Sequence, residues 1–130
     1  MKAYKTLKAG NLMMLRAYIK GPEGKAYPKL LVDTGSAYTI IAHEFLEMIG
    51  CSPALCKKRR RVFTASGIEM LPVVEVELFH CLGQGVENAA ISAHTLPFGT
   101  YMDGLLGMDF LSEFIFDIRP SANEIIRYYS

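Results

Sequence analysis

Residues 30–41 read LLVDTGSAYTII and place one acidic side chain, Asp33, between two hydrophobic stretches. Burying an unpaired charge is costly and can force the group to take up a proton. A turn after a strand would explain the sequence, because Asp, Gly and Ser all favour turns. The run nevertheless returns at once to Tyr-Thr-Ile-Ile, so the chain does not leave for solvent after such a turn. An acid at the end of a buried strand is therefore the strongest constraint on the fold.

Each residue after Asp33 has a use in a catalytic loop. Gly35 has no Cβ and lets another group approach closely. Thr34 and Ser36 carry hydroxyls that can donate to a carboxylate or brace the backbone. Hydrogen bonds donated to a carboxylate favour its ionised form. The pattern indicates a catalytic carboxylate as the alternative to a simple turn.

Acid–base hydrolysis needs a second carboxylate, because water must be deprotonated while the leaving group is protonated. Two close carboxylates do both, since they share one proton. The chain has four aspartates. We expect Asp103 in a loop, Asp109 at the N-cap of a short helix, and Asp117 facing solvent. The simplest source of the second carboxylate is then Asp33 of another copy, related by a two-fold axis.

Length and composition predict one globular domain spanning residues 1–130. Hydrophobic residues make up 51% of the chain and charged residues 21%, which excludes a disordered chain. The net charge of +1 gives no global field that would attract nucleic acid or a membrane surface. The three cysteines are an odd number and indicate free thiols in a reducing compartment.

The N-terminal 20 residues contain LMML as their longest apolar run, which is too short for the core of a signal peptide. No stretch approaches the roughly 18 apolar residues of a membrane span. We therefore expect a soluble, cytoplasmic protein with no membrane contact, or a domain of a longer one.

Strand patterns dominate the chain. VVEVELF alternates between hydrophobic and acidic residues, as a half-buried strand does. The sequence predicts hairpins around residues 21–24, 65–67 and 120–123, a turn at 83–85 and a helix over 43–50. So many strand edges need protection, which favours a closed or heavily wrapped β-structure.

Two segments together resemble the retropepsin-like aspartic proteases. They are LLVDTGS and, well downstream, GLLGMDFL, an apolar-apolar-Gly element that enters a short helix. The resemblance covers about Leu30 to Ile118, most of the chain. It implies a mainly β fold, the retropepsin-like acid-protease β-barrel with one or two short helices. It also implies a half-size relative of pepsin that forms its active site by dimerising.

By this resemblance, Asp33 is the catalytic acid and Thr34 braces the two active-site loops across the dimer. Gly35 shapes the loop, and Ser36 donates to the Asp33 carboxylate. Retroviral enzymes usually have Ala at the position of Ser36, so the resemblance is to the bacterial and cellular members.

The resemblance also assigns two supporting elements. Leu105, Leu106 and Gly107 are expected to pack beside the Asp33 loop. The arms around Ala65, Ser66 and Gly67 are expected to form the flap, a β-hairpin that closes over substrate.

The expected function is an aspartic endopeptidase, active as a homodimer with one Asp33 from each subunit activating a water. Its substrate is an extended peptide or protein, and it needs no cofactor. The alternative is a catalytically silent dimeric peptide-binding module on the same fold.

The basic run consists of Lys57, Lys58, Arg59, Arg60 and Arg61. We interpret it as a solvated strand edge, because charge discourages edge-to-edge aggregation and the rest of the chain is charge-balanced. The rival interpretation is contact with nucleic acid or an acidic partner.

Cys51 and Cys56, together with His43, His80 and His94, raise the question of a zinc site. The C-x4-C spacing lies outside the usual short pattern, and no second cysteine pair follows. We therefore expect structural free thiols and no metal.

Overall fold

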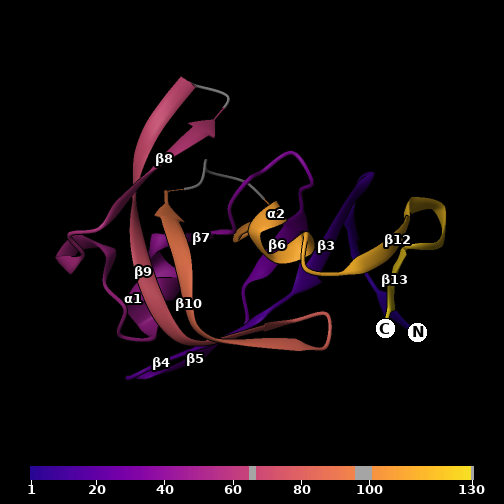
Figure 1. The fold of residues 1–130 in the computed structure, drawn as a ribbon, viewed down its shortest axis with the longest axis horizontal. Coiled ribbons are helices and arrows are strands. Elements are labelled where there is room, and N and C mark those ends of the chain that lie inside the picture. Colours follow the sequence, from indigo (N-terminus) through magenta and orange to yellow (C-terminus); the bar gives the residue numbers. More distant parts are fainter. Residues whose placement is uncertain (65–66, 96–100, 130) are drawn as a thin grey trace.

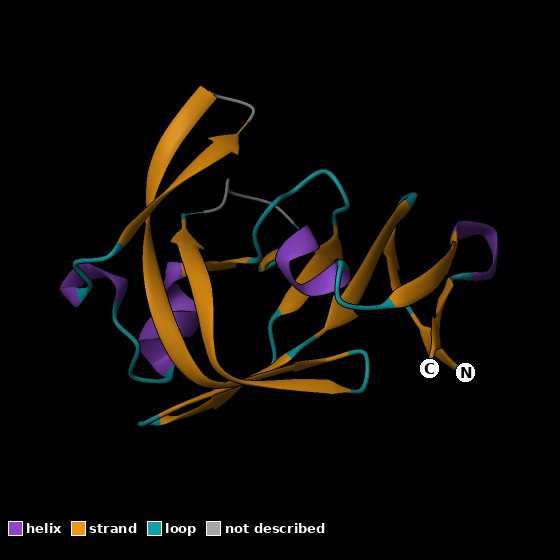
Figure 2. Ribbon diagram, viewed as in Figure 1, coloured by secondary structure: helices purple, strands orange, loops and turns teal. Residues whose placement is uncertain are grey.

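The computed structural model describes residues 1–64, 67–95 and 101–129, and most of them lie in strands (Figure 2). The strands are β1 (Lys2–Lys5), β2 (Leu7–Ala9), β3 (Leu12–Arg16), β4 (Tyr18–Gly21), β5 (Gly24–Ala26), β6 (Lys29–Val32), β7 (Ile40–Ala42), β8 (Arg59–Thr64), β9 (Gly67–Cys81), β10 (Gln84–His94), β11 (Gly104–Leu106), β12 (Ile115–Arg119) and β13 (Glu124–Tyr128). The helices are α1 (His43–Met48) and α2 (Met108–Leu111), with two 3₁₀ turns at Pro53–Leu55 and Pro120–Ala122.

The strands form two sheets. A three-stranded sheet has the order β1–β13–β12 and carries both ends of the chain in Figure 1. A ten-stranded sheet has the order β2–β3–β6–β11–β7–β10–β9–β4–β5, with β8 paired to β9. Within the described residues, no pairing joins β2 to β5. The mainly β fold with two short helices is as predicted, but the expected barrel is a curled sheet that does not close.

Strand β11 lies between β6 and β7 and determines where the ends of these strands meet. It runs parallel to β6, with Leu106 opposite Val32, and antiparallel to β7, with Gly104 opposite Ile41. A Cβ on Gly104 would lie 2.1 Å from the carbonyl oxygen of Ile40, so only glycine fits this position. Segments about seventy residues apart in sequence are thereby held side by side.

The two arms of the hairpin predicted around residues 65–67 are present as an antiparallel pair. These arms, β8 and the first part of β9, pair from Arg59 opposite Pro72 to Thr64 opposite Gly67. Ala65 and Ser66 lie outside the described residues, and Gly67 is the first residue of β9. The arms project away from the rest of the molecule (Figure 1).

The other predicted turns are also found. Gly21 and Gly24 close the β4–β5 hairpin, and the 3₁₀ turn at Pro120–Ala122 joins β12 to β13. The turn between β9 and β10 uses Leu82 and Gly83, one residue earlier than the predicted 83–85. Both have positive φ, 50° and 75°, which is the conformation of the two central residues in a type I′ hairpin turn.

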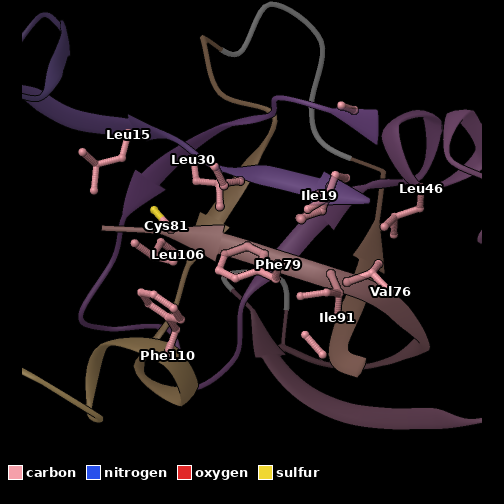
Figure 3. Close-up of a cluster of buried hydrophobic side chains, with 14 of the residues drawn as sticks. Leu15, Ile19, Leu30, Leu46, Val76, Phe79, Cys81, Ile91, Leu106 and Phe110 are labelled. Atoms are coloured by element: carbon pink, nitrogen blue, oxygen red, sulfur yellow. The ribbon is translucent and has the colours of Figure 1, made fainter. Parts of the chain in front are cut away.

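The hydrophobic core lies between β9–β10, the β6–β11 pair and the two helices (Figure 3). As predicted for VVEVELF, Val74 and Val76 are buried while Glu75 and Glu77 are exposed. The rings of Phe79 on β9 and Phe110 on α2 meet edge to face with centroids 5.3 Å apart. Core packing thus fixes α2, which follows the β11 strand, against the centre of the main sheet.

No helix in the described ranges has the length and hydropathy of a membrane span.

The three cysteines differ in their surroundings. All are free thiols, and Cys81 is 2% exposed within the main core. Burial raises the pKa of Cys81 to about 12. Burial, and then the charge of Glu77, also raises the pKa of the less buried Cys51.

We expect iodoacetamide at pH 8 to modify Cys51 and Cys56 in the folded protein well before Cys81. Thiolate is the reactive form, and a pKa near 12 leaves it in roughly one chain in ten thousand at pH 8. Mass spectrometry of peptides after timed labelling measures the three rates. The guanidinium-unfolded protein is the control, in which all three should react alike. Equal rates for Cys81 and Cys56 in the folded state would contradict this placement.

Candidate active site

Asp33 directly follows β6, and its backbone N–H donates to the carbonyl of Leu106 on β11 at 3.1 Å. Its side chain is aimed by the next residues. Oδ1 accepts the N–H of Gly35 at 2.9 Å, and the carbonyl oxygen accepts the N–H of Ser36 at 3.2 Å. The segment is therefore a tight turn, as its residue types favour. The turn also holds a half-buried carboxylate in one orientation.

Gly35 lies against the Asp33 carboxylate. A Cβ at this position would sit 3.3 Å from Asp33 Oδ1, closer than most side-chain contacts. Any larger residue would push the carboxylate or weaken its bond to the Gly35 N–H. The sequence predicted that another group approaches Gly35 closely, and in the structure that group is the Asp33 carboxylate.

The hydroxyl groups of the loop are arranged differently from what the resemblance implied. Ser36 Oγ donates to the carbonyl of Tyr38 at 2.8 Å. A hydroxyl has a single proton to donate, so Ser36 braces the backbone of the loop rather than the Asp33 carboxylate. Thr34 is exposed in the single chain.

The structure places Leu105, Leu106 and Gly107 beside the loop. Leu106 is fully buried in the main core, and Leu105 packs on a smaller cluster of buried residues. A Cβ on Gly107 would lie 2.4 Å from the carbonyl carbon and oxygen of Tyr38. The loop and the start of α2 therefore approach each other as closely as backbones can, which requires glycine here.

Thr39 joins the loop to α2 and was not singled out from the sequence. It is 2% exposed. Its Oγ1 donates to Asp109 Oδ1 at 2.8 Å and accepts the N–H of Gly107 at 3.2 Å, while its own N–H donates to Asp109 Oδ1 at 2.9 Å. A hydroxyl directly before the apolar residues of β7 was the available signal.

The prediction that Asp109 is a helix N-cap is wrong. Gly107 occupies that position, and Asp109 is the second residue of α2. Its carboxylate accepts the N–H of Phe110 at 2.9 Å in addition to the two bonds from Thr39. The first N–H groups of the helix donate instead to the Asp33 loop, Met108 to the Ser36 carbonyl at 2.7 Å and Asp109 to the Ala37 carbonyl at 3.1 Å.

The other two aspartates are engaged elsewhere. Asp103 Oδ2 accepts the N–H of Lys29 at the opposite end of β6 from Asp33. Asp117, on β12, accepts the Tyr128 hydroxyl at 2.6 Å and is about half exposed. Neither carboxylate is available to pair with Asp33 within one chain.

A cleft of about 480 Å³ separates the Asp33 loop from the β8–β9 hairpin. The loop side is formed by Gly35, Ala37 and Tyr38. The hairpin side is formed by consecutive residues of β8, namely Arg60, Arg61, Val62 and Phe63. The hairpin expected to be a flap thus faces the loop across a space that can hold a ligand.

The basic run is only partly a solvated edge. Lys57, Lys58, Arg59 and Arg61 are exposed, and β8 pairs with β9 alone among the described strands. Arg60 instead turns inward and is half-buried in the cleft.

The described residues contain no group of three or more His, Cys, Asp or Glu side chains arranged to hold a metal ion. Cys51 and Cys56 hydrogen-bond to carbonyl groups of β9, those of Glu75 and Val73 respectively.

A curled mixed sheet, a strand threaded between two others, and an Asp-Thr-Gly-Ser loop facing a β-hairpin together define the retropepsin-like aspartic protease fold. The chain belongs to the family described as gag-polyprotein putative aspartyl protease, whose model matches residues 23–113. The match includes the Asp33 loop, the hairpin and β11. The predicted resemblance is confirmed.

Among solved structures, a retropepsin-like aspartic protease from Rickettsia conorii is similar to this chain, with a TM-score of 0.68 and 22% sequence identity. The superposition covers 98% of this chain and 91% of that one. At this identity the similarity establishes the fold. No curated protein sequence matches the chain.

We expect Thr39→Val to lower the free energy of unfolding by about 2 kcal/mol, because it leaves the buried Gly107 N–H without a partner. Thr39→Ser is the matched variant. It keeps the hydroxyl, removes one methyl group and should cost about 1 kcal/mol. Urea unfolding at one fixed protein concentration compares the two. A Val variant as stable as the Ser variant would show that the hydroxyl contributes nothing.

Proposed function

We propose that the protein is an aspartic endopeptidase that hydrolyses peptide bonds as a homodimer, with one Asp33 from each copy in a shared active site. The observation that carries the proposal is the Asp33 loop. It presents a half-buried carboxylate, oriented by the Gly35 N–H, beside a cleft lined by a β-hairpin. Membership of an aspartyl protease family supports the same chemistry.

The proposal of a second copy rests on the chemistry and on the places of the other three aspartates. One carboxylate cannot both take a proton from water and give one to the leaving amine in the same step. The carboxylates of Asp103, Asp109 and Asp117 are held by other partners. A two-fold axis beside the loop would bring the twin of Asp33 opposite it.

Two such carboxylates share one proton, because like charges a few ångström apart cannot both ionise. The ionised Asp33 takes a proton from a water held between the pair, and the water oxygen bonds to the scissile carbonyl carbon. The partner's Asp33, which carries the shared proton, hydrogen-bonds to the carbonyl oxygen. Proton transfer to the amide nitrogen then lets the carbon–nitrogen bond break and releases an acid and an amine.

The surface beside Thr34 suits a second copy. Thr34 borders an apolar groove of about 260 Å³ between α2 and the terminal sheet, lined by Met108, Phe116 and Ile118 among others. Ile115, on the same strand as Phe116, is 70% exposed. Covering apolar surface of this kind with a partner is favourable, because it removes that surface from water. The role of Thr34 in bracing the two loops belongs to this proposed dimer.

We propose that substrate lies extended in the cleft between the Asp33 loop and the hairpin, where its backbone can pair as an added strand would. Ala65, Ser66 and Gly67 would form the end of the flap above it. The three free thiols favour a reducing compartment such as the cytoplasm as the place of action.

We expect Asp33→Asn to lower kcat/KM for peptide cleavage by about a thousandfold or more, because an amide cannot accept the proton from water. A digest of a synthetic peptide library, read by mass spectrometry, finds a substrate and then measures the loss. Asp103→Asn is the matched control. It makes the same chemical change at the other end of β6, where an amide oxygen can still accept the Lys29 N–H.

Retained cleavage in Asp33→Asn would refute the assignment. Tight peptide binding by the unmodified protein, with no cleavage at any acidic or neutral pH, would favour a silent binding module.

The dimer makes a separate prediction. When the active protein is mixed with an about ninefold excess of Asp33→Asn and allowed to exchange subunits, activity per active chain should fall to about a tenth. Most active chains are then paired with an inactive copy. The control is the same excess of a chain that carries Asp33→Asn and a second substitution that prevents dimerisation. Sedimentation must show that this control chain is monomeric. Activity unaffected by the Asp33→Asn chain would mean that one copy suffices.

A further inference from the structure

Arg60 is held in a fixed place in the cleft by two neutral partners. Its guanidinium carbon lies 4.1 Å from the centre of the Tyr38 ring, over the ring face. Its NH1 donates to Oγ of Ser92 at 3.2 Å, and Ser92 is fully buried on β10. The side chain therefore spans from the hairpin to the Asp33 loop and to the main sheet.

Among the described residues, no carboxylate lies within salt-bridge distance of Arg60 or of its neighbour Arg61. The side chains that line the cleft include these two arginines and no acidic residue. A half-buried cation without a counter-ion is unfavourable, and it is most readily explained if the counter-ion arrives with a ligand.

The geometry of the stack leaves the guanidinium able to bind such a ligand. A guanidinium has five N–H donors, and the bond to Ser92 uses one of them. Stacking on Tyr38 covers the flat face of the group and leaves its edge, where the donors are. A carboxylate fits that edge with two parallel hydrogen bonds. Because Arg60 is already ordered, little side-chain freedom is lost on binding.

The position of Arg60 connects this group to the proposed substrate path. Gly35, two residues from the catalytic acid, lines the same cleft. A peptide that lies extended past Gly35 therefore passes Arg60 within a few residues of the scissile bond, and alternate side chains of a strand point to one face.

We propose that Arg60, assisted by Arg61, forms a subsite for an ionised Asp or Glu side chain of the substrate. This inference rests on the proposed endopeptidase function and adds its substrate class, peptides with an acidic residue close to the cleaved bond. In a two-fold symmetric dimer the subsite occurs once on each side of that bond.

The test uses a cleavable peptide found in the library digest, remade with Glu, Gln or Lys at each of four positions on either side of the cleaved bond. At pH 6 the Glu side chain is ionised. At one or more positions we expect kcat/KM for Glu to exceed that for Gln by about tenfold, the ratio for one charge-assisted pair, and Lys to be cleaved most slowly.

Three variants identify the residue responsible. Arg60→Gln should bring the Glu-to-Gln ratio close to one, Arg60→Lys should keep part of it, and Arg60→Glu should reverse the preference in favour of Lys. The matched control is Arg59→Gln, which removes the same charge from the preceding residue of β8, outside the cleft lining. It should keep the full ratio. Both kcat/KM values in the Glu-to-Gln ratio come from the same variant, so a general loss of folded protein lowers both equally and leaves the ratio unchanged.

Binding separates this inference from the proposed function. Fluorescence anisotropy measures how the same labelled peptides bind to the Asp33→Asn chain. Preference for Glu in binding, with no cleavage by the unmodified protein, would sink the protease proposal and keep the acidic subsite. Cleavage with no preference for Glu at any position, or a preference that survives Arg60→Gln, would overturn the subsite and keep the protease. Absence of both cleavage and binding would overturn both.

Discussion

The insertion of β11 between β6 and β7 is the constraint on which the candidate site depends. Asp33 is the first residue after β6, and its N–H continues the hydrogen bonding of β6 to β11. Gly107 follows β11 and meets the backbone of Tyr38 at a distance that leaves no room for a side chain. The carboxylate is therefore positioned by main-chain packing from both sides, with Thr39 and Asp109 closing the arrangement by hydrogen bonds.

Local sequence was enough to find the elements that form this site. Asp-Thr-Gly-Ser after an apolar strand and Gly-Leu-Leu-Gly before a short helix have distinct local patterns, so both could be recognised and expected to meet. Strand alternation in 73–79 and the turn residues of the hairpins are equally local. These features do not depend on what the rest of the chain does.

Contacts between distant segments were beyond this reasoning. Local propensity predicted that Asp109 is a helix N-cap, but its carboxylate is hydrogen-bonded to Thr39, which lies 70 residues away in sequence. The basic run around Arg60 predicted a solvated side chain. Arg60 instead points inward, because it stacks on Tyr38 and donates to Ser92, which belong to two other parts of the chain. Whether the sheet closes depends on how far it curls, which no short stretch encodes. In each case the outcome is decided by tertiary packing rather than by residue type.

Strand β9 has two sets of neighbours along its 15 residues. Gly67 to Pro72 pair with β8, and from Val73 onward the strand pairs with β10 and, near its end, also with β4. The β9 arm of the hairpin thus shares an uninterrupted backbone with the core, so it is a cantilever rooted in the core and not a loop on a pivot. Bending of this arm relative to the Asp33 loop must be absorbed along β9 itself, so the stiffness of the protein interior sets how easily the cleft opens.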